Sequence, residues 1–308
     1  MRGIARIVAA AAAVFVINTA AAQAQADRTF VSGHGADTGT CAVTAPCRSF
    51  VYAISQTAAA GEIVVLDSAG YGPVTIAQSL IITNPGGVEA GITATSGGDA
   101  IQITPSSSAN VTLRGLTLNG AGVGANGIDV APSAPSSVTI IDTLITNFTN
   151  DGILVSYNGE GQHNVNIDIS GTKAFLNGAD GIAILTPNGT SASFVIAGST
   201  ANLNFGNGIH VDASTGYPRG AITDTGAMYN KGSGFLFGGS GYFWLAVMRN
   251  CYALNNVAPD IYNNAPSGEL FLFDNNMAGT LYNEGSTYSD SSNNIIGPSG
   301  TLSPAPKE

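Results

Sequence analysis

The sequence predicts an all-β fold: a single-stranded parallel β-helix, a type of solenoid, with a short capping helix near its amino terminus. Three observations support this prediction. A motif of the form Ala-x-x-Asn-x-x-x-Gly-Ile recurs about every 26 residues, as is typical of solenoids. Within each repeat, apolar and polar residues alternate as they do in strands. The repeats contain no segment with the periodicity of a long amphipathic helix.

The motif supplies the expected corner of each coil. Its asparagines follow one another in steps of 27, 26 and 26 residues, at Asn177, Asn204, Asn230 and Asn256. Stacked asparagines are predicted to form a ladder of amide hydrogen bonds between coils. The glycines four residues later, such as Gly181 and Gly208, are expected to supply the positive φ that a corner needs.

Two or three short strands are predicted in each repeat, and two of them can be placed. One follows the glycine, with inward Ile209 and Val211 on either side of outward His210. The other precedes the motif, with inward apolar residues at Val165, Ile167 and Ile169, at Phe194 and Ile196, and at Phe271 and Phe273. Inward side chains of successive coils should stack about 4.8 Å apart, and each buried isoleucine should contribute about 1.5–3 kcal/mol.

The amino terminus predicts export. Arg2 and Arg6 precede an apolar, alanine-rich stretch over 7–22, and small-x-small cleavage sites follow. Residues 1–26 are therefore interpreted as a signal peptide, with a membrane anchor as the alternative. No later stretch is apolar enough to span a bilayer. The expected location is the periplasm, the cell surface or the medium.

The remaining chain is expected to form one solenoid with a cap. Residues 27–61 are assigned to an amino-terminal cap, 62–296 to the β-helix and 297–308 to a disordered tail. A helix over 47–60 is predicted to cover the open end of the solenoid, and Gly61 to end it. Early strands are expected at 63–66, 74–76, 80–83, 91–95, 100–103 and 111–118.

The three cysteines divide into a pair and a single residue. Cys41 and Cys47 are close together in a chain expected to be exported, which favours a small loop disulfide. A metal site is the weaker alternative, because His34 is the only nearby soft ligand. Cys251 lies in a repeat strand and is expected to be a buried free thiol.

The repeated Asn-x-x-x-Gly-Ile turns over 110–290 resemble those of secreted right-handed parallel β-helix proteins of the pectate-lyase-like superfold. Residues 27–83 resemble the cap of uncharacterised bacterial members of this group. The resemblance implies a right-handed helix and a polysaccharide lying along one outer face. Lyases on this fold typically use a basic residue as proton abstractor and acidic residues that hold calcium, and hydrolases use paired carboxylates.

The net charge of the chain limits the classes of molecule that it is expected to bind. The net charge is −10, and it becomes −12 when removal of 1–26 takes away two arginines and no acid. This argues against nucleic acid, which requires a basic face. It also argues against binding of polyanions unless a divalent cation forms a bridge.

The best acidic pair is Asp151 and Asp180, each directly before the glycine in adjacent coils. Stacked like charges repel, so a calcium ion or a raised pKa would relieve the pair. The alternative interpretation is that Asn and Asp simply suit a turn before glycine.

Catalytic candidates are few. His210 and Asp212 point outward two residues apart and could form an acid/base pair, or else a solvated surface pair. Arg114 is a candidate lyase base. Tyr242-Phe243-Trp244 is the densest aromatic cluster and could stack on sugars, but counting from the asparagines places Trp244 at an inward register, which favours core packing.

These observations lead to two functional hypotheses. The first is an exported, non-catalytic β-helix protein that binds glycans or serves a cell-surface or envelope role, because no complete catalytic set is evident. The second is a polysaccharide lyase or glycoside hydrolase that acts on an acidic polysaccharide along the outer face. No nucleic acid and no membrane span after signal removal are expected.

Overall fold

The structure is a computed structural model that describes residues 25–156, 164–186, 190–214, 216–239, 245–265, 268–283, 286–289, 294–296 and 303–304. Nearly all of the predicted signal peptide, the Tyr242-Phe243-Trp244 cluster and most of the predicted tail lie outside these residues.

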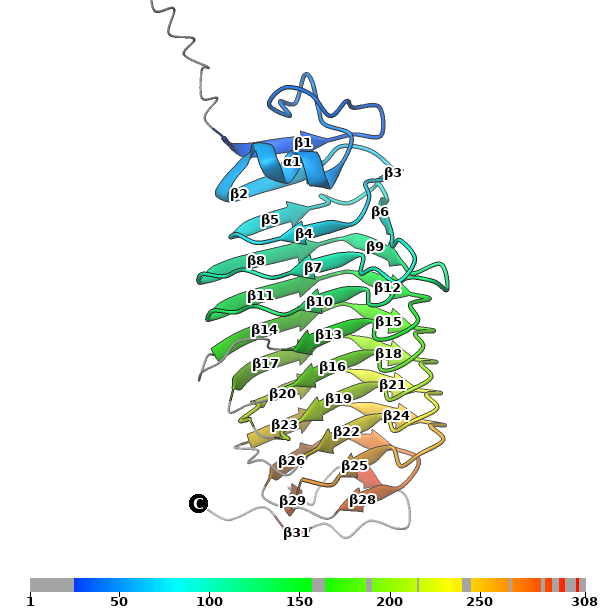
Figure 1. Cartoon of the computed structure of the whole chain (residues 1–308). Coiled ribbons are helices and arrows are strands. Elements are labelled where there is room, and N and C mark those ends of the chain that lie inside the picture. Colours follow the sequence, from blue (N-terminus) through cyan, green and yellow to red (C-terminus); the bar gives the residue numbers. More distant parts are fainter. Residues whose placement is uncertain are drawn as a thin grey trace, which may run out of the picture.

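Three parallel sheets form the faces of a right-handed solenoid of about nine turns (Figure 1). Each coil contributes one strand to each face in turn. We number the sheets in the order in which the chain visits them.

Sheet 1 contains β1 (Ala26–Val31), β2 (Thr57–Val65), β5 (Leu80–Thr83), β8 (Ala109–Arg114), β11 (Ser136–Ile141), β14 (Asn164–Ser170), β17 (Ser191–Ala197), β20 (Arg219–Thr223), β23 (Leu245–Arg249), β26 (Glu269–Phe273), β29 (Ser286–Ser289) and β31 (Ser303–Pro304). Sheet 2 contains β3 (Ala69–Gly70), β6 (Ala90–Thr93), β9 (Leu116–Asn119), β12 (Leu144–Thr146), β15 (Lys173–Phe175), β18 (Thr200–Asn202), β21 (Gly226–Met228), β24 (Tyr252–Leu254), β27 (Asn276–Met277) and β30 (Ile295–Ile296). Sheet 3 contains β4 (Val74–Ile76), β7 (Ile101–Ile103), β10 (Ile128–Val130), β13 (Ile153–Ser156), β16 (Ile182–Leu185), β19 (Ile209–Asp212), β22 (Phe235–Gly238), β25 (Ile261–Asn263) and β28 (Leu281–Asn283).

Apolar columns fill the interior, because residues in register stack from coil to coil. In sheet 3 one buried column runs through Val74, Ile101, Ile128, Ile153, Ile182, Ile209, Phe235, Ile261 and Leu281. These include the residues that the motif placed after each glycine, so the predicted inward register of this strand is confirmed.

The asparagine ladder is also confirmed. Asn177, Asn204 and Asn230 are fully buried. Each donates its side-chain N–H to the side-chain oxygen of the next asparagine, at 3.1 Å, 3.1 Å and 3.0 Å, the last acceptor being Asn256. The ladder satisfies polar groups that the apolar interior would otherwise leave unpaired.

The role predicted for the motif glycines is wrong. The positive φ lies instead at the residue before each ladder asparagine, in Leu176, Leu203, Tyr229 and Asn255. The glycines are required by close packing: a Cβ on Gly181 would lie 2.7 Å from Asn204 Nδ2 and 2.7 Å from the Gly208 carbonyl oxygen.

The predicted register of Phe271 and Phe273 is also wrong. Leu270 and Leu272 are the buried residues of β26, and both phenylalanines lie on its outer side. The coil between β23 and β26 pairs Val247 with Phe271, a step of 24 residues. A step of 24 is even, so it keeps the alternation of inward and outward residues. The prediction failed because Leu270, Phe271, Leu272 and Phe273 are all apolar, so hydrophobicity could not distinguish the inward residues from the outward ones.

A cap closes the amino-terminal end of the solenoid (Figure 1). Its helix, α1, spans Phe50–Gln56 and packs against β1 and β2. It is shorter than the predicted 47–60, because the chain turns to extended backbone at Thr57 and continues as β2. Cys41 and Cys47 form a disulfide in the loop before the helix. The free thiol of Cys251 is buried, which raises its pKa to about 12.

Among the described residues, no helix combines the length and the apolar character needed to cross a membrane.

Candidate functional site

A column of short polar residues runs along the turns that lead into sheet 3. Its members, in successive coils, are Asp99, Asn126, Asp151, Asp180, Asn207 and Ser233. Each of the first five accepts the backbone N–H of the next through its side-chain oxygen; Asp151 Oδ1 accepts from Asp180 at 2.8 Å. Asp151 and Asp180 therefore lie in adjacent coils and help to hold those turns together.

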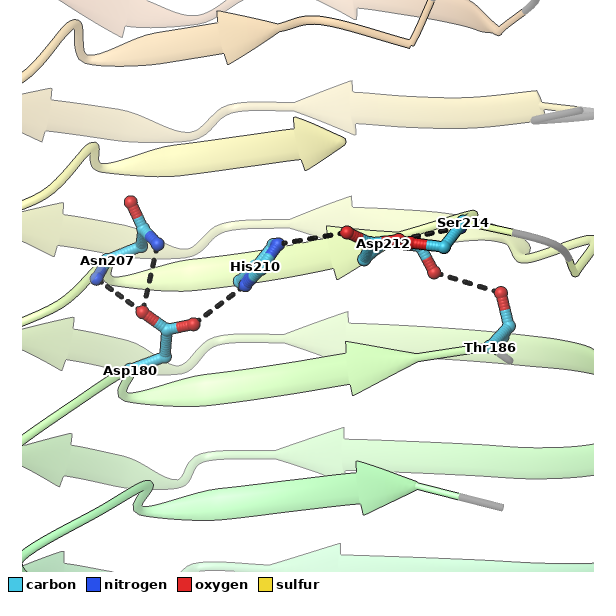
Figure 2. Close-up of polar contacts among 6 residues, drawn as sticks. All are labelled: Asp180, Thr186, Asn207, His210, Asp212 and Ser214. Atoms are coloured by element: carbon cyan, nitrogen blue, oxygen red, sulfur yellow. Dashed lines mark hydrogen bonds and ion pairs between the residues drawn. The ribbon is translucent and has the colours of Figure 1, made fainter. Parts of the chain in front are cut away.

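His210 joins this column from β19 (Figure 2). Its Nδ1 lies 2.8 Å from Asp180 Oδ2, and its Nε2 lies 3.8 Å from Asp212 Oδ2. The three side chains are only 20%, 13% and 25% exposed. His210 is thus held between two carboxylates on the outer face of sheet 3.

The predicted pairs accordingly share one cluster, which we call the histidine–carboxylate cluster: Asp151, Asp180, His210 and Asp212. The contact between Asp180 and His210 was missed from the sequence. The signal that could have found it is their register: Asp180 aligns with Asn207, and His210 follows Asn207 by three residues in the next coil.

The cluster shifts two pKa values in the same direction for different reasons. Burial raises the pKa of Asp151 to about 6, and the nearby negative charge of Asp180 adds to this rise. Burial lowers the pKa of His210, but its hydrogen bond to Asp180 and the charges of Asp180, Asp212 and Asp151 outweigh burial and raise it above its ordinary value.

Asp212 is fixed independently of His210 (Figure 2). Its Oδ1 accepts hydrogen bonds from the backbone N–H of Ser214 at 2.6 Å and from the Ser214 hydroxyl. Its backbone carbonyl accepts from the Thr186 hydroxyl at 2.9 Å. These contacts leave Asp212 Oδ2 directed towards His210.

The Asp151 and Asp180 pair does not suit calcium, which takes six to eight oxygen ligands. Asp180 Oδ1 already accepts two N–H groups of Asn207, and Asp180 Oδ2 contacts His210. Most oxygen atoms of this pair are therefore already engaged, and too few remain for a calcium ion.

Arg114 stands apart from the cluster. It ends β8 on the exposed side of sheet 1, whereas His210 and Asp212 belong to sheet 3. The structure thus does not bring these three catalytic candidates together.

A groove that was missed from the sequence runs over the outer face of sheet 1. Its volume is about 630 Å³. The lining crosses five consecutive coils and includes Ser137, Thr139, Asn166, Asp168, Ser193, Val195, Arg219, Ala221 and Val247. The signal in the sequence is a run of short outward residues at matching register, which leaves the face hollow.

Comparison with known protein families and with curated protein sequences found no match. Among solved structures, the chain is similar to pectate lyase Pel9A, with 15% identity and a TM-score of 0.61 over 89% of this chain and 78% of that chain. A rhamnogalacturonan lyase matches with 14% identity and a TM-score of 0.55 over 85% and 75%. ORF18 of Geobacillus virus E2 matches with 15% identity and a TM-score of 0.55 over 77% and 48%. These similarities show the fold alone: a pectate-lyase-like parallel β-helix.

Proposed function

We propose that this exported protein binds a polysaccharide along the groove on sheet 1 and does not cleave it. Two proteins with the same fold are named as lyases of pectate and of rhamnogalacturonan. Fold alone is a weak argument for function. The proposal therefore rests on the chemistry of the groove.

The groove combines an apolar strip with a row of polar groups, and this combination is the main support for glycan binding. Val195, Ala221 and Val247 stand in register across three coils, and such a strip suits the C–H faces of sugar rings. Asn166, Ser193 and the other polar lining residues offer donors and acceptors for hydroxyl groups. Coils spaced about 4.8 Å apart repeat these groups along the axis, as an extended polymer requires.

The charges of the groove favour a neutral or weakly charged chain. Among the described residues that line it, Asp168 and Arg219 are the charged ones, one of each sign. Arg219 Nε donates a hydrogen bond to Ser193 Oγ at 3.2 Å. A polyanion would meet no net positive charge there, in a protein that is acidic overall.

The groove and the histidine–carboxylate cluster lie on different faces. A polymer bound on sheet 1 would therefore not reach His210 on sheet 3. This separation supports binding without cleavage by that cluster.

A polysaccharide lyase or hydrolase that acts on an acidic polysaccharide is the second candidate, and one observation favours a lyase. Arg219 and Asp168 line the same groove, and they supply the basic and acidic side chains that a β-elimination of a uronate needs. Lyase activity would depend on Arg219, whereas binding of a neutral glycan would not.

The experiment uses the mature chain, residues 27–308, and a panel of neutral and acidic polysaccharides, with calcium and with chelator. The bound fraction and newly formed reducing or unsaturated ends are both measured. Binding without product supports the proposal. Product that disappears in R219Q supports the lyase, and failure of the whole panel to bind overturns both.

Two bulky substitutions show where a polysaccharide binds. Ala221→Trp fills the groove from an outward position, and Leu154→Trp adds the same bulk to the outer side of sheet 3. We expect A221W to lose binding and L154W to keep it, with both circular dichroism spectra unchanged. Binding by A221W at the wild-type level would overturn the assignment to the groove.

A further inference from the structure

Gly238 ends β22 and leaves a notch on the outer face of sheet 3. It is in register with Asp212 of β19 in the preceding coil. Any other residue at this position would place a side chain beside Asp212. A Cβ on Gly238 would have three polar atoms within 4 Å: Asn264 Oδ1 at 3.1 Å, Asp212 Oδ2 at 3.6 Å and His210 Nε2 at 3.8 Å. Three potential ligand atoms therefore converge on one unfilled point.

One of these atoms is a buried amide oxygen. Asn264 Oδ1 is buried, and no hydrogen bond to it is found among the described residues. Buried polar atoms in folded proteins are nearly always paired, so an unpaired amide oxygen directed at the notch indicates a ligand there.

His210 is held in the orientation of a metal ligand. Its Nδ1 contacts the carboxylate of Asp180, which only accepts hydrogen bonds, so Nδ1 carries the proton. In the neutral ring the lone pair of Nε2 then faces the notch. A carboxylate behind the other ring nitrogen is the arrangement that fixes histidines bound to metal ions.

We propose that His210 Nε2, Asp212 Oδ2 and Asn264 Oδ1 bind a divalent first-row transition-metal ion, such as Zn²⁺, in the space that Gly238 leaves open. Imidazole and carboxylate ligands suit these ions. A water molecule has only two protons for three acceptors, whereas a cation satisfies all three. The carboxylates of Asp151 and Asp180 add negative charge beside the site.

The geometry admits a single ion. His210 Nε2 and Asp212 Oδ2 are 3.8 Å apart, which is less than twice the zinc–ligand length of about 2.1 Å. One ion can therefore contact both atoms. Counting only His, Cys, Asp and Glu, the described residues contain no group of three that could hold a metal ion, so the amide of Asn264 is what completes the set.

The site is independent of the proposed glycan groove, so it is tested with metal alone. The mature chain is stripped with chelator, dialysed and titrated with ZnCl₂ by calorimetry, and with CoCl₂ by visible absorption. We expect one ion per chain, and cobalt absorption bands that report nitrogen ligation.

The most informative variant fills the notch without removing any of the three ligand atoms. Gly238→Ala fills the notch and should weaken zinc binding at least tenfold without unfolding the chain. Gly70→Ala is the matched control, because a Cβ there meets no atom within 4 Å, and it should bind zinc like the wild type. H210Q should abolish binding, and D180N should weaken it about 10- to 100-fold through the orientation of His210.

Three results would overturn the proposal. The first is failure of the wild-type chain to bind zinc or cobalt below millimolar concentration. The second is wild-type binding by G238A. The third is loss of binding in H34Q or H163Q with retention in H210Q, which would place the metal at one of the other two histidines of the chain.

Discussion

The carboxylate of Asp180 accepts a hydrogen bond from His210 in the next coil, with Asp180 Oδ2 and His210 Nδ1 2.8 Å apart. Its other oxygen accepts the backbone N–H of Asn207 at 2.6 Å. One side chain therefore holds a turn of the solenoid and orients an imidazole on its outer face. An asparagine in its place could keep the turn, but it would lose the charge that raises the pKa of His210.

Asp151 is predicted to weaken the fold at neutral pH. Its pKa is raised from 3.8 to about 6 by burial beside Asp180, so the folded chain is destabilised once this carboxyl ionises. Stability should therefore fall as the pH rises from about 4 through 6. Asp151→Asn removes the charge and keeps the oxygen that accepts from Asp180, as Asn126 does in the preceding coil.

We expect D151N to raise the free energy of unfolding above pH 6 by an amount on the order of 2 kcal/mol, and to leave it nearly unchanged at pH 4. Urea denaturation across this pH range measures the difference. D180N is the comparison variant. Because Asp180 also pairs with His210, its replacement by asparagine should not raise the free energy of unfolding. An equal effect of D151N at pH 4 and pH 8 would contradict the assigned ionisation.

The asparagine ladder is predicted to be a main source of stability. Asn204 accepts from the backbone and side-chain N–H of Asn177, and it donates to Asn230 Oδ1 and to the Ala174 carbonyl. Asn204→Ala leaves these buried groups unpaired and should cost about 3 kcal/mol. Asn166→Ala, on the exposed side of β14, should cost little. Similar urea midpoints for the two variants would show that the ladder contributes no net stability.

The interior could be predicted from the sequence because stacking repeats the same chemistry at a fixed period. Ile182 and Ile209 occupy equivalent positions in adjacent coils, and one residue type serves both. Asn177 and Asn204 are also equivalent, and the amide of one hydrogen-bonds to the amide of the other. Residues that recur at the period of the repeat therefore contact one another in the fold.

The outer face could not be predicted in the same way. The contact between Asp180 and His210 is diagonal, so no repeat in the sequence marks it. The groove forms because outward residues such as Ala221 have small side chains, and the notch forms because Gly238 has none. In β26 the residues from Leu270 to Phe273 are apolar on both sides of the strand, so alternation could not show which of them face inward.

Ile209 tests the inward column directly. It is 1% exposed and stacks between Ile182 and Phe235. Ile209→Asp would bury an unpaired carboxylate there and should prevent folding or secretion. Ile209→Val keeps the column and should cost about 1 kcal/mol. The measurements are the secreted yield and the melting temperature, and melting of I209D like the wild type would show that the register is wrong.

Asp67 is predicted to tie the cap to the first coil in a pH-dependent way. Its carboxylate accepts from Gly33 N–H at 2.6 Å, from the Ser32 hydroxyl at 2.6 Å and from the Tyr71 hydroxyl at 2.7 Å. These donors, led by Gly33, lower the pKa of Asp67 to about 2. The stabilisation is therefore complete above the ordinary value near 3.8 and is lost as the pH falls through 2.

Asp67→Asn should lower the melting temperature by a few degrees at pH 7, because an amide offers one acceptor oxygen in place of two and brings its own N–H groups towards the donors. The difference from the wild type should shrink between pH 4 and pH 2, as the wild-type carboxyl takes up its proton. Asp27→Asn, at an exposed position of β1, should match the wild type at both values. A deficit of D67N that stays constant down to pH 2 would mean that the variant acts through packing, and the tie would not depend on the charge of Asp67.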